Sequence, residues 1–336
     1  MHKVVLAAPN EVRIVDGTPA QVETGQALVR LRLAGICGSD LSAFRGTSPM
    51  VTYPRVIGHE LLVDVVECID RPELVGRRAV VDPMVRCGKC RACRMGRYNC
   101  CSSLRVMGVH LDGGMQEVTA VESHRLFPVA DSMPDDVAVL AEPLTVAYHA
   151  VERSEIRAGE TAVVFGAGAI GLLIAQLLVR ARGCRALVID IDSARLQIAQ
   201  SLGAMPLQGD EQALTEAVAA ATDGEMAGVV FEATGIASCT RMTTALVAQA
   251  GRIVLVGWNK GPVEVDTVAL MRKEADLLGS RNSMNAFPAV LQLLADGVID
   301  ANVMITHRFG LTEAGAALEL LNTGQENPLK ILIEAV

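Results

Sequence analysis

The chain has 336 residues, of which 51 % are hydrophobic and 3 % aromatic, and its formal net charge is −8. This length is comfortable for two domains. The acidity and the scarcity of aromatic rings argue against a nucleic-acid or anionic membrane partner. Nothing at the N-terminus resembles a signal peptide, and no apolar run approaches the ~20 residues that span a bilayer, so we expect a cytoplasmic protein.

Residues 1–140 contain short strand-like segments. Apolar or alternating stretches, separated by Gly, Pro and Asp, include VVLAA, EVRIV, QALVRLRLAGI and LLVDVVECI. This pattern predicts a β-rich first domain.

Four cysteines lie close together in the run CGKCRACRMGRYNCC, namely Cys87, Cys90, Cys93 and Cys101. Their C-x2-C-x2-C-x7-C spacing allows four thiolates to close around one tetrahedral Zn²⁺, which leaves no open position for chemistry. The spacing therefore predicts a structural zinc site. Cys100, beside the fourth ligand, could compete with Cys101 for the metal.

The same region is basic: from Arg86 to Arg105 the chain carries six cations and no acid. Such a segment could be a zinc ribbon that binds nucleic acid. Alternatively, the cations offset the negative charge of zinc held by four thiolates. The negative net charge of the chain favours the second interpretation.

From about residue 145 the pattern changes to strand, glycine turn, long aliphatic helix and strand. The segments are TAVVF, GAGAIG, LLIAQLLVRARG and RALVID, and further alternating units follow. They predict an α/β fold with a doubly wound parallel sheet. The tail contains two amphipathic helices and a strand-like KILIEAV, and periodicity leaves open whether it caps this sheet or returns to the first domain.

A dinucleotide-binding motif, G-x-G-x-x-G, follows the strand TAVVF at Gly166, Gly168 and Gly171. The first glycine permits a tight turn, the second lets the pyrophosphate approach the backbone, and the third allows close helix–strand packing. Ala169 and Ile170 then place backbone amides at a helix N-terminus, where phosphates bind.

Cofactor choice is indicated by Asp190, which closes the next strand nineteen residues after Gly171. A carboxylate at this position can accept hydrogen bonds from both ribose hydroxyls, whereas a 2′-phosphate would be repelled. Asp192 adds to the repulsion. Arg195 could meet a phosphate, although it is also placed to lie on the exposed start of the following helix. The sequence favours NAD over NADP.

Outside the four-cysteine run, soft or borderline metal ligands are few. They are Cys37 in AGICGSD, His59 and Glu60 in YPRVIGHE, and Glu142 in AEPL. Each alone is weak, but together they supply one sulfur, one nitrogen and two oxygen donors. That set suits a Zn²⁺ site with an exchangeable position.

The motifs GICGSD, GHE, the four-cysteine run, AEPL, GAGAIG and VID occur in the order seen in zinc-dependent medium-chain alcohol dehydrogenases, which the whole chain resembles. The resemblance implies a GroES-like catalytic domain over residues 1–143, with a structural zinc lobe at about 86–103. It further implies an NAD-binding Rossmann domain over 144–281 and a tail, 282–336, that returns to the catalytic domain.

The resemblance also implies roles for single residues. A catalytic zinc would be held by Cys37 and His59, with Glu60 and Glu142 as carboxylate partners of unassigned order. The structural zinc would make two zinc ions per chain. Glu142 replaces the cysteine of alcohol dehydrogenases proper, as in the polyol and sugar branch. Softer motifs, YPRVIGHE and GVHLDGGMQEV among them, are similar to L-galactonate or L-gulonate 5-dehydrogenases.

In that family a hydroxyl matching Ser39 takes the substrate proton, and a histidine three residues later carries it on. This chain has Ser42 there, so the last step of the proton relay stays open. Lys330 matches a position from which a cation reaches the cofactor pyrophosphate, and Asp40 matches an acid that supports the active-site loop. The family forms homodimers and homotetramers, so we expect a homo-oligomer.

The substrate itself would be a small polyol or sugar acid. Because a hexonate carries a carboxylate, we expect cations or hydrogen-bond donors near it. The candidates are His110, Arg281 and Arg55, each of which could equally serve a loop or the surface.

Overall fold

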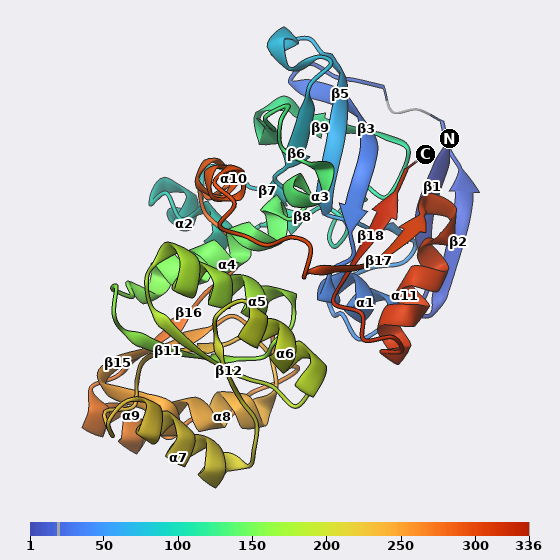
Figure 1. Cartoon of the computed structure of the whole chain (residues 1–336). Coiled ribbons are helices and arrows are strands. Elements are labelled where there is room, and N and C mark those ends of the chain that lie inside the picture. Colours follow the sequence, from blue (N-terminus) through green and yellow to red (C-terminus); the bar gives the residue numbers. More distant parts are fainter. Residues whose placement is uncertain (19–20, 336) are drawn as a thin grey trace. The chain divides into compact units, whose positions relative to one another are not determined.

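The computed structural model describes residues 1–18 and 21–335 and divides the chain into two compact units (Figure 1). Unit 1 contains Met1–Glu142, Phe287–Asp296 and the described residues from Ala301 onward, whereas unit 2 contains Pro143–Ala286 and Gly297–Asp300. Within the described ranges, no helix is both long and apolar enough to cross a membrane.

Unit 1 is built on β-sheets. Its main sheet has the strand order β10-β6-β5-β3-β18-β17, with β9 also paired to β3, and smaller sheets have the orders β2-β1-β4 and β7-β8. The strands are β1 (His2–Ala8), β2 (Glu11–Asp16), β3 (Gln26–Gly35), β4 (Arg55–Val56), β5 (Glu60–Cys68), β6 (Arg78–Val81), β7 (Met84–Val85), β8 (Arg105–Val106), β9 (Val118–Glu122), β10 (Leu126–Pro128), β17 (Ile305–Gly310) and β18 (Lys330–Glu334).

The helices of unit 1 are short and lie at the ends of strands. They are α1 (Gly38–Phe44), α2 (Arg91–Arg94), α3 (Asp135–Ala138), α10 (Phe287–Ala295) and α11 (Ala314–Thr323), with 3₁₀ turns at Pro72–Leu74, Tyr98–Cys100, Ser123–Arg125 and Leu311–Glu313. Alternation along the strands places aliphatic side chains such as Val29, Leu31, Val63 and Val65 in one core. The C-terminal strand β18 pairs with β3, so the tail completes the sheet of the first domain.

Unit 2 is a parallel sheet with the order β13-β12-β11-β14-β15-β16. This confirms the doubly wound α/β fold. The elements are α4 (Ala141–Ser154, which begins in unit 1), β11 (Thr161–Phe165), α5 (Ala169–Gln176), a π-helical turn (Leu177–Ala181), β12 (Arg185–Ile189), α6 (Ser193–Ser201), β13 (Met205–Leu207), α7 (Glu211–Ala221), β14 (Ala227–Glu232), α8 (Ala237–Leu246), β15 (Val247–Leu255), α9 (Thr267–Lys273) and β16 (Asp276–Gly279).

The strand order of unit 2 has a switch point between β11 and β14. The chain runs outward from β11 to β13 and then returns to the other side of β11. Ligands of open α/β sheets bind at the carboxyl ends of the strands beside such a point. The glycine turn that follows β11 lies at this position.

Candidate active site

Cys37, His59 and Glu60 meet in unit 1, where one ligand atom from each lies within 4.8 Å of the others. Cys37 follows β3 and precedes α1, and Glu60 opens β5. Antiparallel pairing sets Gly35 opposite Glu60, which brings the two ends together. His59 and Glu60 are buried. A sulfur, a nitrogen and an oxygen donor in so small a space suit a zinc ion.

Gly35 makes room for the Glu60 carboxylate. A Cβ atom at this position would lie 2.0 Å from Glu60 Oε2, so any other residue would displace the carboxylate. This role of Gly35 is not predicted from the sequence. The only local signal was a glycine at the end of a strand, two residues before a candidate ligand.

Lys330 binds the same carboxylate. Its Nζ lies 2.8 and 2.7 Å from the two oxygens of Glu60 and 3.2 Å from the Ile36 carbonyl oxygen. These contacts use all three ammonium donors. In this structure the Lys330 side chain is buried and bound to Glu60, and its contact with the cofactor pyrophosphate stays a prediction. Burial alone would lower the pKa of Lys330, but the charges of Glu60, Cys37 and Glu142 outweigh it and raise that pKa.

His59 is oriented from both sides of its ring. Its Nε2 lies 3.4 Å from the Ser39 hydroxyl oxygen, and its Nδ1 lies 3.7 Å from Asp40 Oδ1. The other oxygen of Asp40 accepts a hydrogen bond from the Cys37 backbone N–H at 2.9 Å. Burial works to lower the pKa of His59, yet Asp40 and Cys37 raise it well above the usual value.

The surroundings of His59 fit a metal ligand. His59 Nδ1 and Asp40 Oδ1 are buried and have no hydrogen-bond partner among the described residues. A neutral imidazole with its proton on Nδ1 would direct that proton at Asp40 and leave the Nε2 lone pair for a metal, the usual arrangement at zinc sites. Asp40 therefore lies between the Cys37 backbone and the His59 ring, and its support of the active-site loop stays a prediction.

Glu142, in the first turn of α4, borders the cluster without belonging to the set within 4.8 Å. Its pKa is raised to about 7, because burial and the charge of Glu60 outweigh the lowering effect of His59 and Lys330. Glu142 therefore lies within the electrostatic range of His59, Glu60 and Lys330. Of the two predicted carboxylate ligands, only Glu60 belongs to the set within 4.8 Å.

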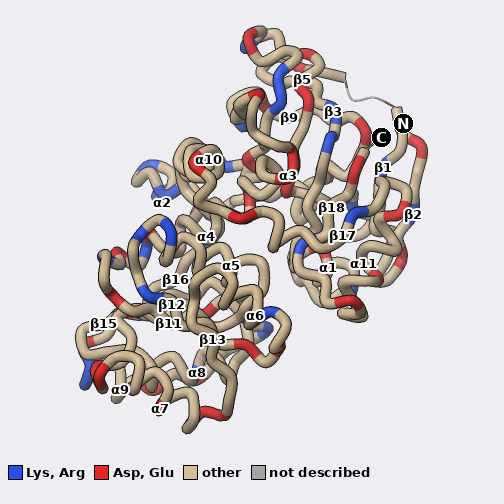
Figure 2. Tube along the Cα trace, in the orientation of Figure 1, with Lys and Arg blue, Asp and Glu red and all other residues tan. Residues whose placement is uncertain are grey.

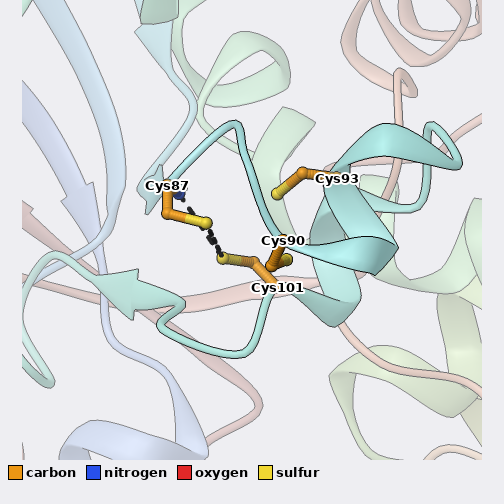
Figure 3. A group of neighbouring side chains, drawn as sticks. All are labelled: Cys87, Cys90, Cys93 and Cys101. Atoms are coloured by element: carbon orange, nitrogen blue, oxygen red, sulfur yellow. Dashed lines mark hydrogen bonds between the residues drawn. The ribbon is translucent and has the colours of Figure 1, made fainter.

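The four predicted structural ligands, Cys87, Cys90, Cys93 and Cys101, form a second group whose sulfur atoms all lie within 4.8 Å of one another. Figure 3 shows their side chains converging from the loop before α2, from α2 itself and from the loop after it. The Cys87 and Cys101 sulfurs are 3.5 Å apart. Backbone N–H groups of Cys93 and Ser102 lower the pKa of Cys90 to about 5, so the loop stabilises a thiolate there. The group fits one tetrahedral zinc ion.

The glycine turn has the geometry that a dinucleotide requires. Gly166 has φ +97°, and a Cβ at Gly171 would lie 1.8 Å from the Gly166 carbonyl oxygen. A Cβ at Gly168 would meet nothing within 4 Å, which leaves open space beside the backbone. Gly168 caps α5, whose first residues are Ala169 and Ile170. The turn can therefore receive a pyrophosphate at the helix N-terminus.

Asp190 lies directly after β12 and faces the same turn. Its Oδ2 accepts a hydrogen bond from the Ala167 N–H at 2.6 Å, and its Oδ1 accepts one from the Asp192 N–H at 2.9 Å. Lone pairs remain for two ribose hydroxyls. Asp192 caps α6, and Arg195 Nε lies 3.5 Å from its carboxylate.

The remaining candidates have local roles in this structure. His110 Nδ1 accepts a hydrogen bond from the Val106 N–H, and Arg55 forms an ion pair with Asp112 at 3.0 Å. Arg281 is exposed in unit 2. Ser42 donates its hydroxyl hydrogen to the Gly38 carbonyl oxygen. The part played by His110 and Arg281 in substrate binding stays a prediction.

Comparisons with known proteins agree with both metal groups. A family model described as an alcohol dehydrogenase GroES-like domain matches residues 23–131, and one described as a zinc-binding dehydrogenase matches 169–296. A zinc-type alcohol dehydrogenase-like protein of Haemophilus influenzae is 40 % identical over 98 % of this chain and 97 % of its own length. The chain belongs to the zinc-containing medium-chain alcohol dehydrogenase family.

Two relatives of this alcohol dehydrogenase bear on its chemistry. L-Galactonate-5-dehydrogenase of Escherichia coli is 36 % identical over 84 % of each chain. The structure of the alcohol dehydrogenase RspB from Escherichia coli, solved with NADH, has a TM-score of 0.94 at 32 % identity and covers 99 % of both chains. The present chain is thus a zinc- and NAD-dependent dehydrogenase of polyol or sugar-acid type, acting on CH–OH groups.

Zinc-free alcohol dehydrogenase should lose stability as the pH rises from about 5 to about 8. The pKa of Glu142 is raised from 4.5 to about 7 in the folded state. The folded protein therefore binds more protons than the unfolded chain between these values, and raising the pH withdraws that stabilisation. We expect the free energy of unfolding to fall by roughly 2 kcal/mol over this pH range. This figure is discounted for solvent screening, because the Glu142 side chain is partly exposed. Thermal unfolding of the zinc-free protein measures the effect, and Glu142→Gln should remove much of this slope; an unchanged slope would contradict the assignment.

Cys90→Ser should release one zinc ion per chain and lower the melting temperature of the alcohol dehydrogenase. The three remaining thiolates cannot complete a tetrahedral site. Metal analysis and calorimetry measure the result, and Cys100→Ser is the matched control, since Cys100 lies outside the group. Selective loss of hydride transfer in a stable, fully loaded Cys90→Ser protein would refute the structural role.

Asp190→Ala should weaken NAD⁺ binding by about tenfold, because the variant lacks the carboxylate that accepts hydrogen bonds from the ribose. The preference of the enzyme for NAD⁺ over NADP⁺ should also become smaller, because the charge that repels the 2′-phosphate is gone. The ratio of kcat/KM for the two cofactors measures this. Asp223→Ala, at an exposed position in the same unit, is the control. If Asp190→Ala leaves the ratio unchanged, the ribose is held by other groups.

Proposed function

We propose that this enzyme oxidises a secondary alcohol of a sugar acid, a hexonate such as L-galactonate or L-gulonate, with NAD⁺ as hydride acceptor. One observation carries the proposal: a Cys37, His59 and Glu60 group, with His59 and Glu60 buried and the Ser39 hydroxyl 3.4 Å from His59, in a chain 36 % identical to L-galactonate-5-dehydrogenase. The sugar-acid substrate follows the relative, and the reaction class follows the site.

The two ligand groups provide for two zinc ions per chain, one structural and one catalytic. Cys37, His59 and Glu60 would hold the catalytic ion, with Glu142 as the neighbouring carboxylate. When bound there, zinc acts as a Lewis acid that lowers the pKa of the substrate hydroxyl.

The side chains around the cluster have distinct tasks. Ser39 is placed to accept the hydroxyl proton, since its oxygen lies beside His59. Asp40 fixes the His59 ring, and Lys330 fixes Glu60. The hydroxyl of Ser42 can still accept a hydrogen bond after donating to Gly38, so it can receive a water in the proton path.

The cofactor sites lie in unit 2. The glycine turn would hold the pyrophosphate, and Asp190 would hold the adenosine ribose. NAD⁺ is preferred over NADP⁺ because Asp190 and Asp192 would both repel a 2′-phosphate. Arg195 already lies against Asp192 and offers that phosphate little compensation.

A neutral polyol is the second candidate substrate. The cation that borders the cluster, Lys330, is bound to Glu60, and Arg55 is bound to Asp112. A polyol such as sorbitol would need neither side chain. A non-catalytic sensor is less well supported, because a sensor would have no need for the combined Cys37, Ser39, His59 and Glu60 set.

The test is NAD⁺ reduction, followed by the absorbance of the reduced nicotinamide, with L-galactonate, L-gulonate, other hexonates, sorbitol and L-threonine. Each substrate is assayed with and without a zinc chelator. Chelator-sensitive activity that favours one hexonate is the expected result. A preference for sorbitol or threonine would retain the reaction class and overturn the sugar-acid substrate. No turnover by the zinc-loaded, NAD-binding protein would overturn the proposal.

A further inference from the structure

The segment around the structural cysteines is an exposed cationic surface. We define the cationic segment as residues 86–105, which contains six basic residues and no acid. All six side chains are exposed: Arg86, Lys89, Arg91, Arg94, Arg97 and Arg105. In the described part of the chain, none of them forms an ion pair within 4.0 Å. Figure 2 shows Lys and Arg, without Asp or Glu, around α2.

The charge of the metal group does not account for this surface. Zinc with four thiolates carries a net charge of about −2, so about four of the six positive charges are left over. The composition is also selective, with five arginines to one lysine. Met95, at the end of α2, is 55 % exposed among them. Arginine and methionine are enriched at protein–protein interfaces, whereas lysine is depleted there.

The charge of the remaining chain favours one kind of partner. The whole chain carries −8 and the cationic segment +6, which leaves −14 on the other residues. A long nucleic acid would be repelled by that remainder. A second copy of this chain would instead offer its acidic surface to the cationic segment.

An acidic surface of suitable character lies on α7 in unit 2. Residues 196–240 contain no lysine or arginine. The α7 face, as defined here, consists of five exposed acids on and beside the helix: Asp210 at its N-cap, Glu211 and Glu216 within it, and Asp223 and Glu225 after its end. None of the five forms an ion pair among the described residues. The helix between them is rich in alanine (EQALTEAVAAA), which lets long arginine side chains approach the backbone.

We propose that the cationic segment of one copy binds the α7 face of a second copy. The surfaces are opposite in charge, and among residues 1–18 and 21–335 neither of them forms an ion pair. The contact joins different patches, so it either occurs twice across a two-fold axis or continues to further copies. It is independent of the substrate and of catalytic turnover.

The experiment is a charge exchange measured by sedimentation velocity on the zinc-loaded protein. One variant carries Arg91→Glu with Arg97→Glu, and the other carries Glu211→Lys with Glu216→Lys. Each variant alone should associate roughly tenfold more weakly than wild type, because like charges then face one another. An equimolar mixture should recover association, since both contacts regain opposite charges. Wild-type association should weaken between low and high salt.

A double variant with Arg77→Glu and Arg185→Glu is the matched control, as it makes the same charge change at exposed positions outside both surfaces. Zinc content and dehydrogenase activity verify folding of every variant. The proposal is overturned if both charge variants associate like the control, or if the mixture shows no recovery. It is also overturned if the Arg91→Glu, Arg97→Glu protein loses only heparin binding while its self-association is unchanged.

Discussion

His59→Ala should lower kcat for alcohol oxidation by about a thousandfold or more, with NAD⁺ binding preserved. His59 is the buried nitrogen donor of the Cys37, His59 and Glu60 group, and its ring separates Ser39 from Asp40. Removing it leaves a metal site with one sulfur and carboxylates, which bind zinc less well. The glycine turn and Asp190 belong to the other unit, so dinucleotide binding should be unaffected.

Three measurements check this prediction: steady-state turnover, zinc content, and NADH titration by fluorescence. Zinc content should fall from two ions per chain to one. His124→Ala, which changes an exposed histidine in the same unit, is the control and should retain both ions. Full turnover by His59→Ala would remove the catalytic-zinc assignment altogether.

Lys330→Met should lower the apparent free energy of unfolding by about 3–5 kcal/mol. The Lys330 and Glu60 side chains are 3 % and 2 % exposed, and the ammonium contacts both carboxylate oxygens. Without the lysine, Glu60 becomes a buried charge with no compensating partner, which is the costly half of a buried ion pair. Zinc should reduce the loss, because it supplies positive charge beside the same carboxylate.

Denaturant unfolding with and without zinc measures this effect. The double variant Lys330→Met with Glu60→Gln should recover much of the lost stability, since no unpaired charge then remains. Lys260→Met, at an exposed position, is the control. If the single and double variants are equally unstable, the lysine stabilises the protein through packing and not through its charge.

The parts of the site that could be predicted from the sequence are those whose residues lie close together along the chain. The four structural cysteines lie within 15 residues, and the glycine motif within six. The spacing of the cysteines is set by the tetrahedral geometry of zinc, and the spacing of the glycines by the turn that receives a phosphate. By contrast, the Lys330–Glu60 pair joins residues 270 positions apart, and a lysine before an apolar run carries no sign of its partner. Gly35 was missed for the same reason.

The ends of helices and strands likewise depend on contacts between distant residues as well as on the local sequence. The segment RMTTALVAQAG is rich in helix-forming residues, yet α8 ends at Leu246 and β15 begins at Val247. Pairing of Ala227 with Val247 extends the strand into a segment of high helix propensity, so the sheet overrides the local preference. Helix α7 was not predicted, because only Leu214 and Val218 on it are buried and its apolar stripe is narrow.

The pairing of β18 with β3 also sets an order of events during synthesis. The central strand of the unit 1 sheet, β3, is translated before unit 2, whereas its neighbour β18 is translated after it. Residues 143–286 have their own core and can fold while the first sheet still lacks an edge. Glu60 therefore gains its Lys330 partner only after unit 2 has been translated, so the catalytic metal centre is completed late in synthesis. A truncated or stalled product would hold an unfinished sheet that exposes a free strand edge to aggregation.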